Sequence, residues 1–122
     1  MAGAANVSTT LTVSGLGASR TQDNSFSGEV PTAVTSQYIT QTTSDAAEAL
    51  PLGDISTVEG VLIKAISNDA YIDTSFNSSM SNEIELAEGE SCYFKPVGTV
   101  YFLNKTANPA KVVLDYTVFG TV

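Results

Sequence analysis

Four glutamates crowd one short stretch of the sequence and are the best candidates for carboxylate chemistry: Glu83, Glu85, Glu88 and Glu90. Several carboxylate oxygens close together would suit a calcium ion, which prefers oxygen ligands. Two of the four could also form the acid pair of a glycoside hydrolase. However, the first two alternate with aliphatic residues, which is typical of a strand with one solvated face. We therefore expect neither a metal site nor a catalytic pair here.

The rest of the sequence offers few groups for catalysis. It contains no histidine, so a serine or cysteine nucleophile would lack its usual base, and zinc its commonest nitrogen ligand. Cys92 is the single cysteine, which excludes an internal disulfide framework. Its apolar neighbours favour a buried free thiol over an exposed reactive one, and an intersubunit disulfide is the alternative. No glycine-rich stretch matches a phosphate-binding loop. We predict a protein that is not an enzyme and needs no cofactor.

Length and charge narrow the classes of partner. A chain of 122 residues corresponds to one domain, and its net charge of −8 repels phosphate, which disfavours nucleic acid. No apolar run reaches 18 residues, so we expect no membrane span. The N-terminus has no basic and apolar leader pattern, so we expect synthesis in a cytosol.

The elements that must position any site are short strands. Alternating or apolar runs rich in β-branched and aromatic residues are separated by Gly, Pro, Asn and Asp, which is typical of a β-sandwich or barrel. Residues 112–119 alternate most clearly and should place one parity in a core. Residues 100–103 are apolar on both parities, which predicts a central strand covered on both sides. The predicted core consists of Val61, Ile63, Ile84, Leu86, Phe102, Leu114, Tyr116 and Val118.

These runs predict an all-β fold: a single β-sandwich of jelly-roll type with seven or eight strands and an extended N-terminal segment. Residues 1–19 would form the extended arm and residues 20–122 the sandwich. Residues 45–50 contain helix formers and would make at most one helical turn, or a loop, before Pro51.

The N-terminal third is poor in large apolar side chains. Ordering a residue costs about 1–2 kcal/mol of backbone entropy, which so sparse a segment recovers poorly by folding on itself. We therefore expect it to pack on another chain, as strands can do at an exposed sheet edge. The candidate interface residues are Val7, Leu11, Val13, Leu16, Phe26 and Tyr38.

Short motifs after residue 43 resemble a known family. Leu52-Gly53-Asp54 precedes a strand that ends in Ile63-Lys64, and a later turn carries Gly89-Glu90. This order resembles small β-sandwich virion proteins of tailed bacteriophages. The resemblance implies a capsid decoration or cement protein made in the bacterial host cytoplasm and located in the virion. It also implies a homotrimer bound to the major capsid protein or another virion protein, where buried apolar area opposes the pressure of packed DNA.

Three other classes stay open. A tail or head or tail-fibre module would share the same fold and the same absence of catalytic residues. A carbohydrate-binding adhesin module would need an exposed aromatic platform, and the five tyrosines lie within strand patterns instead. A glycosidase would need a cleft around the glutamates, for which the sequence shows no motif.

Overall fold

The structure is a computed structural model that describes residues 3–15, 17, 19–27, 31–42, 46–105 and 111–122. These residues form strands and loops, and no helix among them could span a membrane. The strands are β1 (Asn6–Val13), β2 (Arg20–Ser27), β3 (Ala33–Gln41), β4 (Glu48–Ala49), β5 (Thr57–Ser67), β6 (Ala70–Phe76), β7 (Ile84–Leu86), β8 (Ser91–Phe94), β9 (Thr99–Asn104) and β10 (Val112–Thr121).

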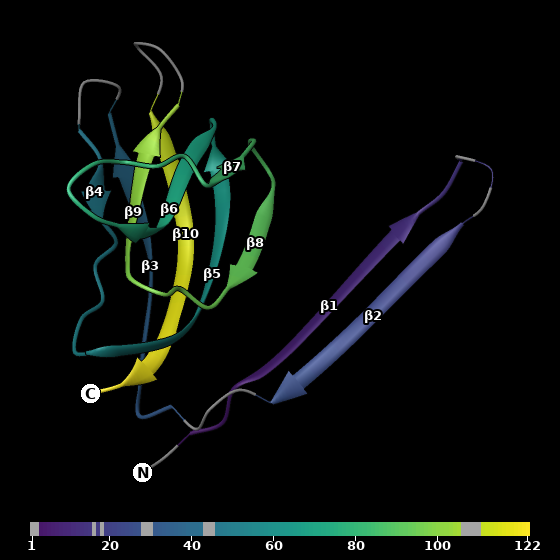
Figure 1. Cartoon of the computed structure of the whole chain (residues 1–122), viewed down its shortest axis with the longest axis horizontal. Coiled ribbons are helices and arrows are strands. Elements are labelled where there is room, and N and C mark those ends of the chain that lie inside the picture. Colours follow the sequence, from purple (N-terminus) through teal and green to yellow (C-terminus); the bar gives the residue numbers. More distant parts are fainter. Residues whose placement is uncertain (1–2, 16, 18, 28–30, 43–45, 106–110) are drawn as a thin grey trace.

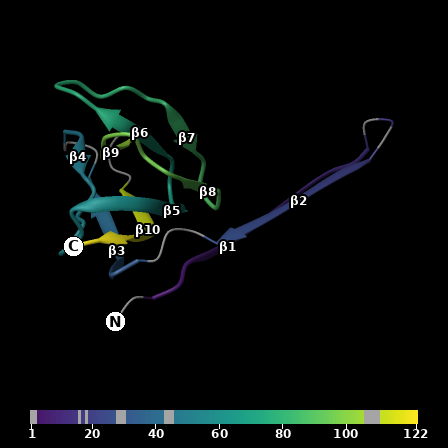
Figure 2. The same cartoon turned by 60° about the horizontal axis from the view of Figure 1, so that its bottom comes forward.

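Eight of the strands form two stacked sheets. One sheet has the order β3-β10-β5-β8 and the other β4-β9-β6-β7. Figures 1 and 2 show the two layers facing each other, with β1 and β2 outside them as a separate two-stranded sheet.

The pairing of the eight strands is nested. β6 pairs with β7, β5 with β8, β4 with β9 and β3 with β10, all antiparallel, as in one long hairpin. Two further antiparallel pairs, β10–β5 and β9–β6, form because the long hairpin is rolled up, which brings these strands side by side within each sheet. A rolled hairpin of eight strands in two sheets is a jelly roll. The predicted all-β jelly-roll sandwich is therefore confirmed, with eight strands in the sandwich.

The core lies between the two sheets and follows the alternation of the strands. In β10, Val112, Leu114, Tyr116 and Val118 are buried, as their shared parity predicts. Of the other predicted core residues, Ile84 is half-buried at the edge of the core, and the remaining four are buried. Phe119 has the outward parity yet is also buried, because the N-terminal segment lies over it.

Strand β9 is central, as predicted, with β4 on one side and β6 on the other. Val100 and Phe102 point into the core and are buried. Tyr101 and Leu103, on the opposite parity, are half-buried. The Tyr101 ring stacks on Phe76, with centroids 3.5 Å apart. The second face of β9 is thus covered only in part.

The helical turn considered for residues 45–50 is wrong where the structure describes it; residue 45 lies outside the described residues. Glu48 and Ala49 form β4 and pair with β9, and Leu50 enters the core. The helix formers are overridden because pairing with β9 places Leu50 in a buried position.

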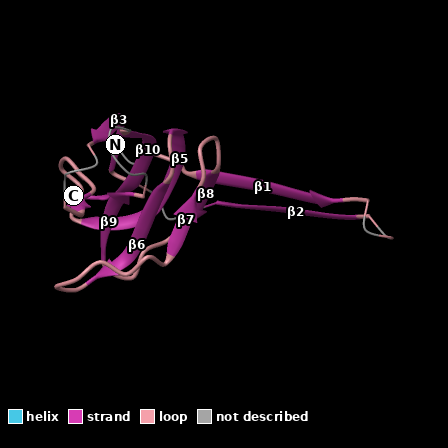
Figure 3. Ribbon diagram, turned by 90° about the horizontal axis from the view of Figure 1, so that it is seen from above, coloured by secondary structure: helices cyan, strands magenta, loops and turns pink. Residues whose placement is uncertain are grey.

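The N-terminal region forms a hairpin, which we call the ribbon: β1 paired with β2 from Asn6↔Ser27 to Val13↔Arg20. Gly15 and Gly17, which connect the strands, have φ of 83° and 100°, a conformation that glycine adopts without strain. The boundary predicted at residues 19 and 20 therefore falls between the two strands of the ribbon, and the sandwich begins at β3. Figure 3 shows the ribbon extending well beyond the sheets.

Candidate functional site

The ribbon has one apolar side and one polar side. Residues directly opposite each other in an antiparallel pair share a face, so the register sorts the side chains. The apolar side carries Val7, Thr9, Leu11, Val13, Arg20, Gln22, Asn24 and Phe26. The polar side carries Asn6, Ser8, Thr10, Thr12, Thr21, Asp23, Ser25 and Ser27. Polar pairs across it, such as the Thr12 and Thr21 hydroxyls at 3.4 Å, confirm the shared face.

Most of the apolar side is open to solvent. Leu11 is 60 % exposed and Phe26 51 %. An isolated two-stranded hairpin is marginally stable in water and needs packing on one face. Large apolar groups that follow one side of such a ribbon form an exposed apolar surface of the kind that marks interaction sites.

Only the base of the ribbon packs on the sandwich. The backbone N–H of Gly3 donates to the Pro31 carbonyl at 2.9 Å, which ties the start of the chain to the entry of β3. The Phe26 and Tyr93 ring centroids lie 5.9 Å apart, and burial raises the pKa of the Tyr93 hydroxyl. Val7 is half-buried in the same region. The apolar side of the ribbon is thus the side that meets the sheet.

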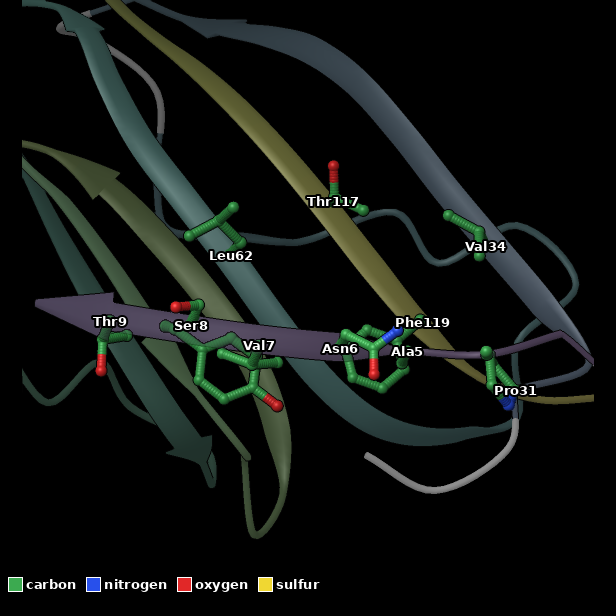
Figure 4. Close-up of a pocket in the computed structure, with 12 residues that line it drawn as sticks. Ala5, Asn6, Val7, Ser8, Thr9, Pro31, Val34, Leu62, Thr117 and Phe119 are labelled. Atoms are coloured by element: carbon green, nitrogen blue, oxygen red, sulfur yellow. The ribbon is translucent and has the colours of Figure 1, made fainter. Parts of the chain in front are cut away.

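A groove of about 430 Å³ lies between the ribbon base and the sheet (Figure 4). Its walls are Ala4, Ala5, Asn6, Val7, Ser8, Thr9, Pro31, Val34, Leu62, Tyr93, Thr117 and Phe119. Gly60 packs behind two of these wall residues, since a Cβ there would lie 2.5 Å from both the Phe119 ring and the Tyr93 hydroxyl. The groove is mostly apolar and contains no charged side chain, so it suits packing rather than catalysis.

The outer face of the sheet continues this apolar surface beyond the ribbon. Tyr38 is 68 % exposed and Val34 61 %, both on β3, and Leu62 on β5 is 50 % exposed. In the ladder, Asp115 lies between Tyr38 and Lys64 at the centre of this face. We call the part around Val34, Tyr38 and Asp115 the β3 face.

The predicted interface residues fall into three groups. Val7 and Phe26 lie at the ribbon base and already contact the sandwich in part. Leu11, Val13 and Tyr38 are exposed on the ribbon and the β3 face. Leu16 lies outside the described residues.

Sequence reasoning missed Val34 and Leu62 as members of this surface. Leu62 belongs to an apolar run but has the opposite parity to the buried Val61 and Ile63, which is the signal that could have identified it. Val34 shares its parity with Tyr38 in the same way.

Three of the four glutamates engage separate partners through their carboxylates. Glu83 accepts hydrogen bonds from the Thr74 N–H and from the Ser75 hydroxyl, and Glu85 pairs with Lys105. Glu90 accepts from the Ala87 N–H within its own turn. Throughout the described residues, no three His, Cys, Asp or Glu side chains are placed to hold a metal ion. These contacts shape loops, and none forms a binding site.

Asp73 is the one buried carboxylate of the described residues, a feature that the sequence reasoning also missed. Burial alone would raise its pKa, but the N–H groups of Ser81 and Ser75 donate to it at 2.8 and 2.9 Å. Together with a hydrogen bond involving Glu83, they lower the pKa. With both oxygens occupied, Asp73 anchors the loop between β6 and β7.

Cys92 faces the core from β8 and is half-buried. Burial raises the pKa of its thiol, so the reactive thiolate is scarce near neutral pH. This agrees with an inert structural cysteine.

Comparison of the chain with protein-family models, with curated proteins and with solved structures found no match. The features of the chain that bear on its function are therefore the uncovered apolar side of the ribbon and the β3 face.

Proposed function

We propose that this chain is a non-enzymatic structural protein of a bacteriophage virion, of the capsid decoration type. It binds across junctions between capsomers and stabilises the head. The single observation that supports the proposal is the contrast between the two parts of the molecule. The jelly roll has a complete core of its own, whereas the projecting ribbon has its apolar side exposed to solvent. The motifs that resemble phage virion proteins fall in the jelly roll.

The mechanism is mechanical. Eight paired residues extend a ribbon by about 26 Å at ~3.3 Å per residue, enough to reach from one shell subunit to another. Burial of apolar side chains contributes about 25 cal/mol per Å² of apolar area. Contacts that bridge two subunits oppose their separation when packed DNA presses outward.

The charged side chains are consistent with a binding role. Those that lie close together stabilise loops or form ion pairs, such as Lys95 Nζ with the Glu59 carboxylate at 3.1 Å. The net charge of −8 favours the major capsid protein or another virion protein as partner over nucleic acid, and we propose no membrane partner. The protein would be made in the host cytoplasm and carried in the virion.

A tail or fibre module is the second candidate, and the same projecting ribbon favours it because fibres also assemble through extended elements. Copy number in purified particles separates the two. A decoration protein is present in several copies for every capsomer, whereas a tail component is present in few copies per particle.

The direct test adds purified protein back to particles that lack it. We expect the full chain to bind the head and to raise the temperature at which DNA is released. A chain without residues 1–27 should stay folded, because every core residue lies in the sandwich, but should bind poorly. Thr12→Asp, on the polar side of the ribbon opposite Thr21, is the matched control and should bind normally. Absence of binding by the full chain to heads would overturn the proposal.

A further inference from the structure

The ribbon leaves the sandwich in a defined direction. Its first residues lie beside Pro31, next to the start of β3, and Phe26 contacts Tyr93 on β8 at the opposite edge of the sheet. Figure 4 shows β1 crossing the strands between these points, and Figure 1 shows the ribbon continuing beyond β8. The outer half of the ribbon therefore projects from the edge of the sheet that is farthest from β3.

The outer half of the ribbon and the β3 face, both uncovered apolar surfaces, are consequently at opposite sides of the molecule. Leu11 and Val13 lie on the outer half of the ribbon, beyond β8. Val34 and Tyr38 lie on the β3 face, which the chain's own ribbon does not reach with its outer half. One molecule cannot join these two surfaces, but two molecules side by side can.

The contact at the ribbon base shows that the two surfaces are compatible. There the apolar side of the ribbon already packs on the outer face of this same sheet, through Val7, Phe26 and Tyr93. The apolar side of a neighbour's ribbon would continue that packing onto the β3 face, with the same kinds of side chain in contact.

Charge favours a second copy as the occupant. Two chains of net charge −8 repel through most of their surfaces. The apolar side of the ribbon, however, carries a single charge, the cation Arg20, opposite Val13. The β3 face carries the carboxylate Asp115, which lies between Tyr38 and Lys64 in the ladder, so its charge is balanced across the face. Neither surface carries the net negative charge that makes the rest of the two chains repel.

Strand β3 also needs protection. It is a nine-residue edge strand without charge or proline, whereas the other edge strands β4, β7 and β8 have two, three and four residues. Long uncharged edges are normally covered, because they otherwise recruit foreign strands. A neighbour's ribbon that reaches the β3 face would cross this edge and sterically hinder the approach of a foreign strand.

We infer that the outer half of the ribbon of one copy binds the β3 face of a second copy. The contact joins different surfaces of identical chains, so repeated contacts close into a ring when the rotation permits. A trimer is the ring that the proposed capsid role favours. The inference rests on the proposed function only for this ring size and its place on the shell; the contact itself is a property of the free protein.

The test measures mass in solution by light scattering over a range of protein concentrations. We expect the full chain to form an oligomer. Leu11→Asp places a charge on the apolar side of the ribbon, and Tyr38→Asp places one on the β3 face. Each substitution should reduce the mass to that of one chain, 12.7 kDa. Thr12→Asp, adjacent to Leu11 but on the polar side and opposite the uncharged Thr21, should remain oligomeric. Tyr38→Ser serves as a milder variant of the β3 face if Tyr38→Asp lowers the melting temperature.

Mixing the two monomeric variants gives the decisive measurement. The Leu11→Asp chain keeps an intact β3 face and the Tyr38→Asp chain keeps an intact ribbon, so one functional contact can form. We expect a dimer with one copy of each variant and nothing larger. A mixture that stays monomeric would overturn the inference, as would a monomeric full chain or an oligomer that survives both substitutions.

Particle binding separates this inference from the proposed function. Full occupancy of heads by the monomeric Leu11→Asp variant would refute a need for the contact between copies in head binding and leave the decoration role standing. An oligomer that forms as expected yet binds no head would refute the decoration role alone.

Discussion

The sandwich and the ribbon are both made of antiparallel strands with alternating side chains, yet one buries its apolar parity and the other exposes it. In the sandwich, Leu114 on β10 is fully buried because a second sheet lies over it. In the ribbon, Leu11 occupies an equivalent position in the alternation and remains 60 % exposed. Alternation therefore establishes that a strand has two unlike faces, but the presence of a second layer decides whether the apolar face contributes to stability.

The difference also separates two uses of apolar surface. In the sandwich, the eight strands cover one another, and the free energy of burial stabilises the fold. In the ribbon, the same kind of surface stays available for another molecule. Substitutions of matched chemistry in the two regions should therefore affect different properties.

The largest effect is expected for Leu114→Ala. The side chain lies in the centre of the core, so its loss leaves a cavity and should lower the free energy of unfolding by about 2–5 kcal/mol. Urea denaturation followed by circular dichroism measures it. A change of only ~0.5 kcal/mol, typical of a surface substitution, would mean that the inward parity of β10 is misassigned.

A smaller effect is expected for Asp73→Asn. An amide can accept from only one of the two N–H groups that now donate to the carboxylate, and its own NH₂ would face the other. The expected cost at neutral pH is about 1–3 kcal/mol. Because the pKa is lowered in the folded state, this stabilisation is present above the ordinary value of 3.8 and is lost as pH falls through the folded pKa.

The pH dependence provides the control for Asp73. Below pH 3.8 the parent chain should lose stability, and the Asn variant should lose less, so the two curves converge on acidification. Parallel curves would show that the Asp73 carboxylate does not stabilise the loop.

Much of the sandwich could be predicted from the sequence. The parity of β10 and most of the core followed from alternation, because both faces of that strand differ clearly in polarity. The pairing of strands could not be predicted: β3 and β10 are joined by contacts such as Phe119↔Val34, far apart in sequence. Local patterns contain no information on which distant strands meet.

The ribbon was predicted only in part, for two physical reasons. β2 contains Phe26 as its one large apolar residue, so it lacks the alternation of apolar and polar residues that β1 has. Gly15 and Gly17 lie between the two strands with positive φ, but glycines alone do not specify that the flanking residues pair with each other. The candidate interface residues Leu11, Val13 and Tyr38 are exposed, but their partner is not encoded in local sequence.

The junction between the two regions can be loosened with Gly60→Ala. The new Cβ would force apart the Phe119 ring and the Tyr93 hydroxyl, which support the ribbon base. Overpacking costs about 1–3 kcal/mol, and replacing glycine within a strand recovers about 0.5–1 kcal/mol, so the net loss should be about 1 kcal/mol.

The rate of limited trypsin digestion measures how firmly the ribbon is held at this junction, independently of global stability. Arg20 precedes every lysine of the chain, so cleavage after it reports on the ribbon. Gly60→Ala should accelerate this cleavage while cleavage within the sandwich stays slow. An unchanged rate would show that Gly60 does not help to hold the ribbon.

The smallest effect on stability is expected for Leu11→Ala, which removes the same atoms as Leu114→Ala from the uncovered region. Because Leu11 is already hydrated, its truncation creates no cavity and should change the unfolding free energy by less than ~0.5 kcal/mol. The measurement must be made at a protein concentration low enough for single chains, since an oligomer would add the contact between copies to the stability. At higher concentration the same substitution should weaken assembly. A loss comparable to that of Leu114→Ala in the single chain would mean that the ribbon is covered within one molecule, and the contrast between the two regions would disappear.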